Sequence, residues 1–505
     1  MGEEGSMRNE DDAEGLVAEV YDPRMDSWRC VLAPYHWLRM LAMELHWSFV
    51  FGVIVVYGIS EGLGGSFSRV ATEYYWKDVQ KVQPSEAQIY GGITSIPWMV
   101  KPLWGLCTDV VPMLGHRRRP YFIIAGLIGI ASMLFISLHK RLHILLAVLS
   151  LTAGSAAVAI ADVTVDACVA ENSNKHQLLA ADMQSLCALS SSTGALVGYF
   201  ISGILVHLIG PKGVYGLLAI PPALVLLAGV LLKEPRVTNL SCGQVSKKFS
   251  EAAQAMWTTL KLPEVWRPCL YMYLSLGLSL DIKEGMFYWY TSASDGPHFS
   301  QEFIGYKSSI GSVGSILGAV LYQYTLKDYH FRDLCLWTQV IYGLSGMLDL
   351  ALVLRLNLRL GISDYFFAVI DDYVLKMTGR LKWMPLLVLS AKLCPPGIEG
   401  TFFALLMSID NVGLFTSSWG GGVLMHILGI TRTNFGNLWI AILIRNILRI
   451  GVVGLLFLIP RADPDSSILS TEVVVDADVT IEVSKEENIE LVSLINNDVT
   501  TMEID

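Results

Sequence analysis

The chain has 505 residues, of which 53% are hydrophobic and 16% are charged. Because apolar windows of about 18 or more residues recur along nearly the whole length, this composition excludes an ordinary soluble protein and predicts an integral membrane protein. The formal net charge of -10 comes largely from the two ends of the chain, which we expect to be solvated, and it indicates no nucleic-acid partner.

The apolar segments predict an all-α membrane fold with about twelve transmembrane helices. In chain order, the predicted spans are 45–62, 86–107, 120–138, 142–166, 179–206, 213–232, 268–291, 303–325, 333–354, 378–396, 399–427 and 437–460. The charged stretch 364–376 is predicted to extend the tenth helix outside the membrane. Glycines in spans five and eight predict close helix packing.

A long central loop divides the spans six and six, a layout typical of transporters built from parallel repeats. The predicted domains are a cytoplasmic N-terminal segment 1–44, a six-helix bundle 45–232, a cytoplasmic loop 233–267, a second six-helix bundle 268–460 and an acidic disordered tail 461–505. Basic residues in "GHRRRP" and in the central loop place both termini in the cytoplasm. The acidic N-terminus disfavours a plastid transit peptide, so the plasma membrane is the default expectation.

The loop after span two carries the motif "GLCTDVVPMLGHRRRPY". Its candidate gating residues are Gly105, Asp109, Gly115, Arg117, Arg118 and Arg119. A carboxylate at a helix end beside an arginine cluster can form a charge network that breaks when the helices separate. The alternative is that the arginines only anchor the loop on the cytoplasmic side.

The stretch "AIADVTVDACVAE" ends span four with two carboxylates on one helix face, because Asp162 and Asp166 are four residues apart. Unpaired carboxylates facing lipid are unfavourable, so we expect the pair to face the mouth of a cavity near the inner boundary of the membrane. Asp162 is predicted either to pair with Lys101 or to take up a proton, whereas Asp166 can also be a solvated helix end. Pro97 and Pro102 are expected to loosen the helix around Lys101, which can hold an anionic substrate or extend towards the cytoplasm.

Further charged and aromatic residues in the second half predict a polar route through the bundle. The candidates are Glu284, Tyr288, Lys392, Glu399 and Asp410. The sequence has no Walker A loop, HExxH or GxSxG motif and no histidine cluster, so we predict no enzyme, no cofactor and no metal site.

Several segments together resemble the folate-biopterin transporter family, in particular its plant members. They are "GVIVVYGISEGLG", "SIPWMVKPLWGLCTDVVPMLGHRRRPY", "AIADVTVDACVAE", "FYWYTSASDGPHFSQEFIGYKSSIGSVGSILGAVLY" and "KWMPLLVLSAKLCPPGIEGTFFALLMSI". This resemblance implies the major facilitator fold, with two pseudo-symmetric six-helix bundles around a central cavity. It also implies transport of folates or pterins, commonly with protons, and it places Lys101, Asp162, Asp166, Lys392 and Glu399 on family motifs.

The leading hypothesis is therefore a monomeric secondary active transporter in the lipid bilayer that moves folates or pterins by alternating access, coupled to protons. One alternative is another small organic anion or heterocycle, because "ENSNKH" keeps Glu171 but lacks the arginines that many members of the family have there. A second alternative is a non-transporting receptor or scaffold.

Overall fold

The computed structural model describes residues 27–139, 141–236, 250, 254, 256–394 and 399–460, although the side chains of residues 27–33, 109, 110, 174 and 399–401 lie outside this description. Contacts divide the chain into two units, residues 1–51 and 52–505. Helix α2 (Ser27–Glu44) lies in the first unit, and α3 (Trp47–Val53) ends in the second. The described residues of the second unit form helices and the loops between them, with one isolated β-bridge between Met113 and His116.

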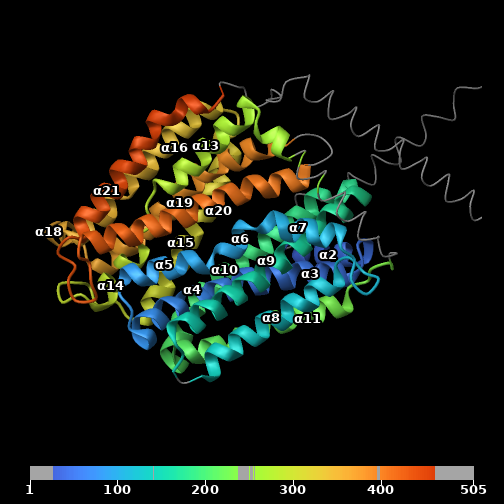
Figure 1. Ribbon diagram of the computed structural model, residues 1–505, viewed down its shortest axis with the longest axis horizontal. Coiled ribbons are helices and arrows are strands. Elements are labelled where there is room, and N and C mark those ends of the chain that lie inside the picture. The colour runs from blue at the N-terminus through green and yellow to red at the C-terminus, as the bar shows by residue number, and fades with distance from the viewer. Residues whose placement is uncertain are drawn as a thin grey trace, which may run out of the picture. The chain divides into compact units, whose positions relative to one another are not determined.

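The helices of the N-terminal half follow each other in short segments (Figure 1). They are η1 (Ile54–Gly64), α4 (Gly65–Tyr74), η2 (Tyr75–Gln80), α5 (Pro84–Thr94), α6 (Ile96–Met99), α7 (Lys101–Val110), α8 (Arg119–Leu138), α9 (Ile144–Lys175), η3 (Gln177–Leu179), α10 (Ala180–Leu217) and α11 (Ile220–Leu231). Gly210 has a φ of 70° and kinks α10, so that its last turns align with α11 as a separate membrane crossing.

The C-terminal half has the same segmented organisation. Its helices are α13 (Pro263–Gly277), α14 (Lys283–Ser292), α15 (Gln301–Leu321), η4 (Tyr322–Leu326), α16 (Phe331–Ser345), α17 (Met347–Val353), α18 (Leu356–Arg359), α19 (Asp364–Lys392), α20 (Glu399–Ile427), α21 (Leu438–Gly451) and η5 (Val452–Leu458).

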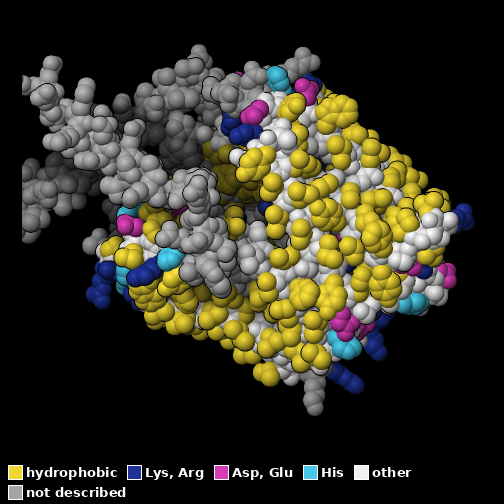
Figure 2. All heavy atoms as spheres, turned by 180° about the vertical axis from the view of Figure 1, so that it is seen from behind, with side chains coloured by type: hydrophobic (Ala, Val, Ile, Leu, Met, Phe, Trp, Pro, Cys, Tyr) yellow, Lys and Arg dark blue, Asp and Glu magenta, His cyan; other side chains and the backbone are white. Residues whose placement is uncertain are grey.

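Six helical stretches in the described part of the chain are long and apolar enough to cross a membrane. They are Trp47–Gln80, Arg119–Leu138, Ile144–Ser173, Gln177–Leu231, Phe331–Val353 and Leu438–Leu458. Large apolar side chains are exposed on these helices and cover much of the face seen in Figure 2. The predicted all-α membrane fold is confirmed. The first predicted span was too short, because the helical stretch continues through Arg69 and Glu73 to Gln80.

Two of the crossings are interrupted near the middle. The second crossing breaks between α5 and α7, around Pro97 and Pro102, as the prolines predicted. The seventh crossing breaks between α13 and α14, where the backbone N–H of Asp281 donates to the carbonyl of Ser417 on α20 at 3.0 Å. A Cβ at Gly421 would collide with the carbonyl of Asp281, so only glycine permits this approach.

The two halves pack closely along α10 and α15. The Ser309 hydroxyl donates to the carbonyl of Leu196 at 3.0 Å. A Cβ at Gly203 would overlap the Gln301 backbone, and Gly314 and Gly318 of α15 face the backbone of α19 in the same way. Helix α19 packs along α15 over much of its length, including the stretch 364–376 that we expected outside the membrane, where Asp371 is only 2% exposed.

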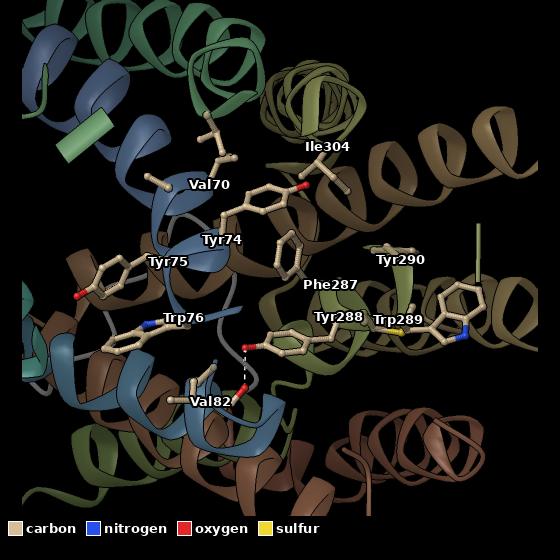
Figure 3. Close-up of a cluster of buried hydrophobic side chains, with 14 of the residues drawn as sticks. Val70, Tyr74, Tyr75, Trp76, Val82, Phe287, Tyr288, Trp289, Tyr290 and Ile304 are labelled. Atoms are coloured by element: carbon tan, nitrogen blue, oxygen red, sulfur yellow. Dashed lines mark hydrogen bonds between the residues drawn. The ribbon is translucent and has the colours of Figure 1, made fainter. Parts of the chain in front are cut away.

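At one end of the second unit, aromatic side chains of both halves form a buried cluster (Figure 3). The rings of Tyr74 and Phe287 meet edge to face at 4.9 Å. The Tyr288 hydroxyl donates to the Val82 carbonyl at 3.1 Å. From the segment between α20 and α21, Arg432 donates to the same carbonyl and to that of Lys77. This end, which we call the aromatic end, is therefore closed by contacts between the halves.

Candidate functional site

The carboxylates of α9 meet the lysine of α7, as the sequence predicted. Lys101 forms ion pairs with Asp162 and with Asp166, the second at 3.2 Å. Two residues of η1 complete the cluster: the Tyr57 hydroxyl donates to Asp166, and Glu61 lies beside Asp162. Asp162 is 4% exposed. The cluster thus contains three carboxyl groups and one lysine, so it can take up a proton without leaving the lysine unpaired.

Three adjoining cavities are lined by residues of both halves, with volumes of about 550, 520 and 360 Å³. The first lies mostly within the N-terminal half, and Lys283 and Glu284 reach it from the other half. Arg69 and Lys283 line all three, and Trp98 lines the first two. Glu61 lines the largest cavity, so the Lys101 cluster borders it. Volumes of this size suit a small organic molecule.

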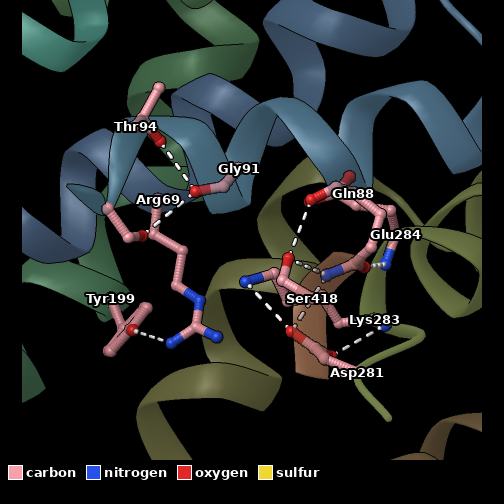
Figure 4. Close-up of polar contacts among 10 residues, drawn as sticks. Arg69, Gln88, Gly91, Thr94, Tyr199, Asp281, Lys283, Glu284 and Ser418 are labelled. Carbon is pink, nitrogen blue, oxygen red and sulfur yellow. Dashed lines mark hydrogen bonds and ion pairs between the residues drawn. The ribbon is translucent and has the colours of Figure 1, made fainter. Parts of the chain in front are cut away.

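A polar network surrounds Arg69 and Lys283 where the cavities meet (Figure 4). Arg69 donates to the Tyr199 hydroxyl at 3.4 Å, and Lys283 pairs with Asp281 at 3.4 Å. From α5, the Gln88 side chain donates to Asp281 at 3.1 Å and to Ser418 at 2.9 Å. This network joins α5 of the N-terminal half to the broken seventh crossing and to α20.

The third cavity is lined by a second, internally balanced charge cluster on α15, α17, α19 and α21. Arg445 pairs with Asp349 at 2.7 Å, and both side chains are buried. Lys376 pairs with Asp372 at 3.0 Å, and Lys307 reaches the same carboxylate at 3.7 Å. Asp371 lines the same cavity, so the three cations Arg445, Lys376 and Lys307 face three carboxylates.

The arginine motif holds together helix ends within the N-terminal half. The backbone N–H groups of Arg117, Arg118 and Arg119 donate to the Glu234 carboxylate at 2.7 to 3.1 Å, a typical anion position at the start of a helix. The Arg118 guanidinium also donates to Thr108 at 3.0 Å.

Two glycines of the same motif have distinct positions. Gly115 has a φ of 74° and makes a turn before the arginines, and Gly105 faces Val163 of α9. The side chain of Asp109 lies outside the described part of the structure.

The remaining predicted residues lie in different places. Glu284 lines the largest cavity, with a buried carboxylate oxygen that has no hydrogen-bond partner. Tyr288 lies at the aromatic end instead of lining a cavity. Asp410 is 6% exposed, and Lys392 lies near the end of α19 with its ammonium 5.8 Å from the Phe331 ring centroid. The side chain of Glu399 is not described.

Several cavity residues were missed. Glu61 follows Tyr57 at helical spacing in "YGISEG", a signal that could have placed both residues on one face. Arg69 lay beyond the predicted end of span one. Lys382 occupies an apolar span without an obvious partner, and this is itself a signal of function in a membrane helix.

With this geometry in place, comparison with known proteins identifies the family. Residues 61–476 match the model of the BT1 family. The chain belongs to the BT1 family. Over 92% of its length it is 60% identical to the probable folate-biopterin transporter 2 of Arabidopsis thaliana, covering 94% of that protein. It is 33% identical to the folate-biopterin transporter of Synechocystis, over 82% of each chain.

Solved structures similar to this BT1 family member share its fold. A nucleoside transporter, NupG, superposes with a TM-score of 0.62 at 14% identity, over 81% of this chain and 99% of its own. A D-xylose-proton symporter gives a TM-score of 0.57 at 14% identity, over 83% of this chain and 98% of its own. The predicted family and major facilitator fold are confirmed, and the names in the family indicate a transporter, not an enzyme.

Proposed function

We propose that this protein is a secondary active transporter that moves folates or pterins across a membrane by alternating access, coupled to protons. The observation that carries the proposal is the set of adjoining cavities lined by residues of both halves and bordered by the Lys101–Asp162–Asp166 cluster. The names of its relatives supply the substrate class.

The chemistry of the cavities suits this cargo. A pterin ring has an amide-and-amine edge whose N–H groups can donate hydrogen bonds to a carboxylate such as that of Glu61 or Glu284. The flat face of the ring can stack on Trp98. The anionic glutamate of folate suits lysine or arginine. Cavities lined with both kinds of group therefore match both ends of a folate.

Proton coupling is proposed for the Lys101 cluster. When Asp162 or Glu61 takes up a proton, Lys101 keeps Asp166 as its partner at 3.2 Å. The cluster can thus exist in two protonation states without an unpaired buried cation, which is what a reversible proton site requires.

For alternating access, the aromatic end must open while the opposite end closes. The bonds from Tyr288 and Arg432 to the Val82 carbonyl are the contacts that would break. The breaks in the second and seventh crossings provide hinges beside the cavity.

We further propose that residues 45–232 and 268–460 form two six-helix bundles and that the protein is a monomer. Both termini are proposed to lie in the cytoplasm, and the membrane is proposed to be the plasma membrane. Arg117 to Arg119 would then brace the cytoplasmic helix ends.

The test is uptake of labelled folic acid and of labelled biopterin into liposomes containing the purified protein, with and without an inward proton gradient. We expect gradient-driven uptake by the wild type and its loss in Asp162→Asn. The matched control is Glu171→Gln, because Glu171 is half exposed and pairs only with Lys175, one turn away, among its described contacts. Wild-type protein that moves neither compound would refute the proposed substrate, and gradient-independent uptake would refute proton coupling.

A further inference from the structure

Two buried cations line the second cavity without an ion pair to any described carboxylate. Lys382 on α19 and Arg449 on α21 are each 6% exposed. Lys382 donates to the Ser275 carbonyl at 3.0 Å and lies 3.4 Å from the Ser279 hydroxyl. Arg449 donates to the Ser279 carbonyl at 3.3 Å, while its Nη1 has no partner. In the described part of the chain, neither cation has a carboxylate within ion-pair distance. Asp410 acts on Lys382 from beyond 4.0 Å. Asp349 and Asp281 act on Arg449, which also lines the third cavity, from beyond the same distance.

The two cations share one aromatic surface. The centroid of the Tyr342 ring is 4.9 Å from the Lys382 ammonium and 4.4 Å from the Arg449 guanidinium. Cation–π contacts and neutral hydrogen bonds hold both side chains in position without neutralising them. Buried charges that are held but not neutralised form a ready binding site for an anion.

The first cavity is the more acidic of the two. Three carboxylates line it, from Glu61, Glu73 and Glu284, whereas the described lining of the second has one, from Asp281. Arg69 and Lys283 line both cavities. Glu61 Oε1 and Glu284 Oε2 are buried without a hydrogen-bond partner. Unpaired acceptor oxygens fit a ligand edge that carries N–H donors. Trp98 lines both cavities, so one elongated ligand can pass along it from the acidic cavity into the basic one.

We infer that the protein binds folates in one orientation, with the pterin ring in the Glu61–Glu284 cavity and the glutamate carboxylates on Lys382 and Arg449. This inference rests on the proposed function and adds to it two separate subsites within one route. The subsites also predict that a pterin without a glutamate tail is carried without using the cation pair.

The first test uses the wild-type protein and two fragments of folic acid. Biopterin carries the ring, and p-aminobenzoylglutamate carries the tail. Each fragment is expected to compete with folic acid for binding to the purified transporter, yet the two fragments are expected not to compete with each other. Mutual competition between the fragments, or no competition by p-aminobenzoylglutamate against folic acid, would overturn the two-subsite assignment.

The second test uses Lys382→Met and Arg449→Gln. Loss of one charged contact is expected to raise the half-saturating concentration of folic acid by about tenfold or more, while that of biopterin changes by less than about twofold. Lys327→Met is the matched control, because Lys327 is exposed just after η4 and lines none of the three cavities. Retained biopterin uptake shows that the variants fold.

The outcomes separate this inference from the proposed function. If the wild type carries folic acid and biopterin but the variants lose both equally, or lose neither, the subsite inference is wrong and the function stands. If the wild type binds neither compound, the proposed function is wrong and the inference fails with it.

Discussion

Replacing Lys101 by methionine is expected to destabilise the protein more than removing either of its carboxylate partners. Lys101→Met leaves Asp162 without a cation, and the Asp162 side chain is only 6% exposed. Removal of one partner from a buried ion pair costs about 3–5 kcal/mol, because the remaining charge stays desolvated. Asp162→Asn, in contrast, leaves Lys101 paired with Asp166 at 3.2 Å, so we expect only the loss of one charged contact, about 1–3 kcal/mol.

The double variant Lys101→Met/Asp162→Asn tests the mechanism directly. It removes the carboxylate that the first substitution leaves unpaired, so it should be more stable than Lys101→Met alone. The matched control is Lys175→Met. Lys175 pairs with Glu171 at 2.7 Å, but the two side chains are 59% and 52% exposed. An exposed pair at this spacing contributes about 0.3–0.5 kcal/mol.

The measurement is the thermal unfolding midpoint of the detergent-solubilised protein, followed by tryptophan fluorescence and by size-exclusion chromatography. A membrane protein of this size need not unfold in two states, so the rank order of the midpoints is the criterion. The expected order, from most to least stable, is Lys175→Met, Asp162→Asn, the double variant and Lys101→Met. The explanation by an unpaired buried carboxylate would be refuted if the double variant were no more stable than Lys101→Met. It would also be refuted if Asp162→Asn were less stable than Lys101→Met.

Three further predictions concern other parts of the fold. Gly421→Ala should lower the unfolding midpoint by the equivalent of about 1–3 kcal/mol, because its Cβ would meet the Asp281 carbonyl, whereas Gly451→Ala has open space and should change little. Arg432→Gln should weaken the contacts that close the aromatic end. With spin labels at the exposed positions Asp78 and Asp295, this variant should increase the fraction of molecules in which the two labels are far apart. Arg359→Gln, at another exposed arginine, should leave that fraction unchanged. The proposed orientation is tested with single introduced cysteines. A cysteine replacing Asn434 should react with an impermeant maleimide in intact cells, whereas a cysteine replacing Tyr329 should react only after permeabilisation. The reverse pattern would show that the orientation is the opposite of the proposed one.

The sequence predicted the fold well because apolar length and the position of prolines are local properties. Hydropathy located most crossings to within a few residues, and Pro97 and Pro102 located a break. Hydropathy misplaced the end of a span where a membrane helix carries charged residues that face a cavity. The first predicted span ended at residue 62 and left Arg69 outside, because hydropathy disfavours charged residues in a span, although this arginine lies inside the bundle and lines all three cavities.

The site was predictable only where its residues lie close in sequence. The spacing of Asp162 and Asp166 predicted one shared face, and both carboxylates lie on Lys101. In contrast, Glu234 lies more than 110 residues from the arginines whose backbone it binds, and no local pattern connects them. The same holds for Lys382 and Arg449, which are brought together only by α19 and α21 packing around Tyr342.

The unneutralised charges favour a transporter over the scaffold hypothesis. A scaffold could keep the pair of Asp349 and Arg445, which is neutral within itself and can hold helices together. It gains nothing from Lys382 and Arg449, because a buried cation without a counter-ion destabilises the fold that carries it. Such a charge persists when a ligand supplies the missing partner for part of a cycle and then leaves. The more acidic first cavity and the more basic second cavity favour, in the same way, the proposed ligand with a donor edge at one end and an anion at the other.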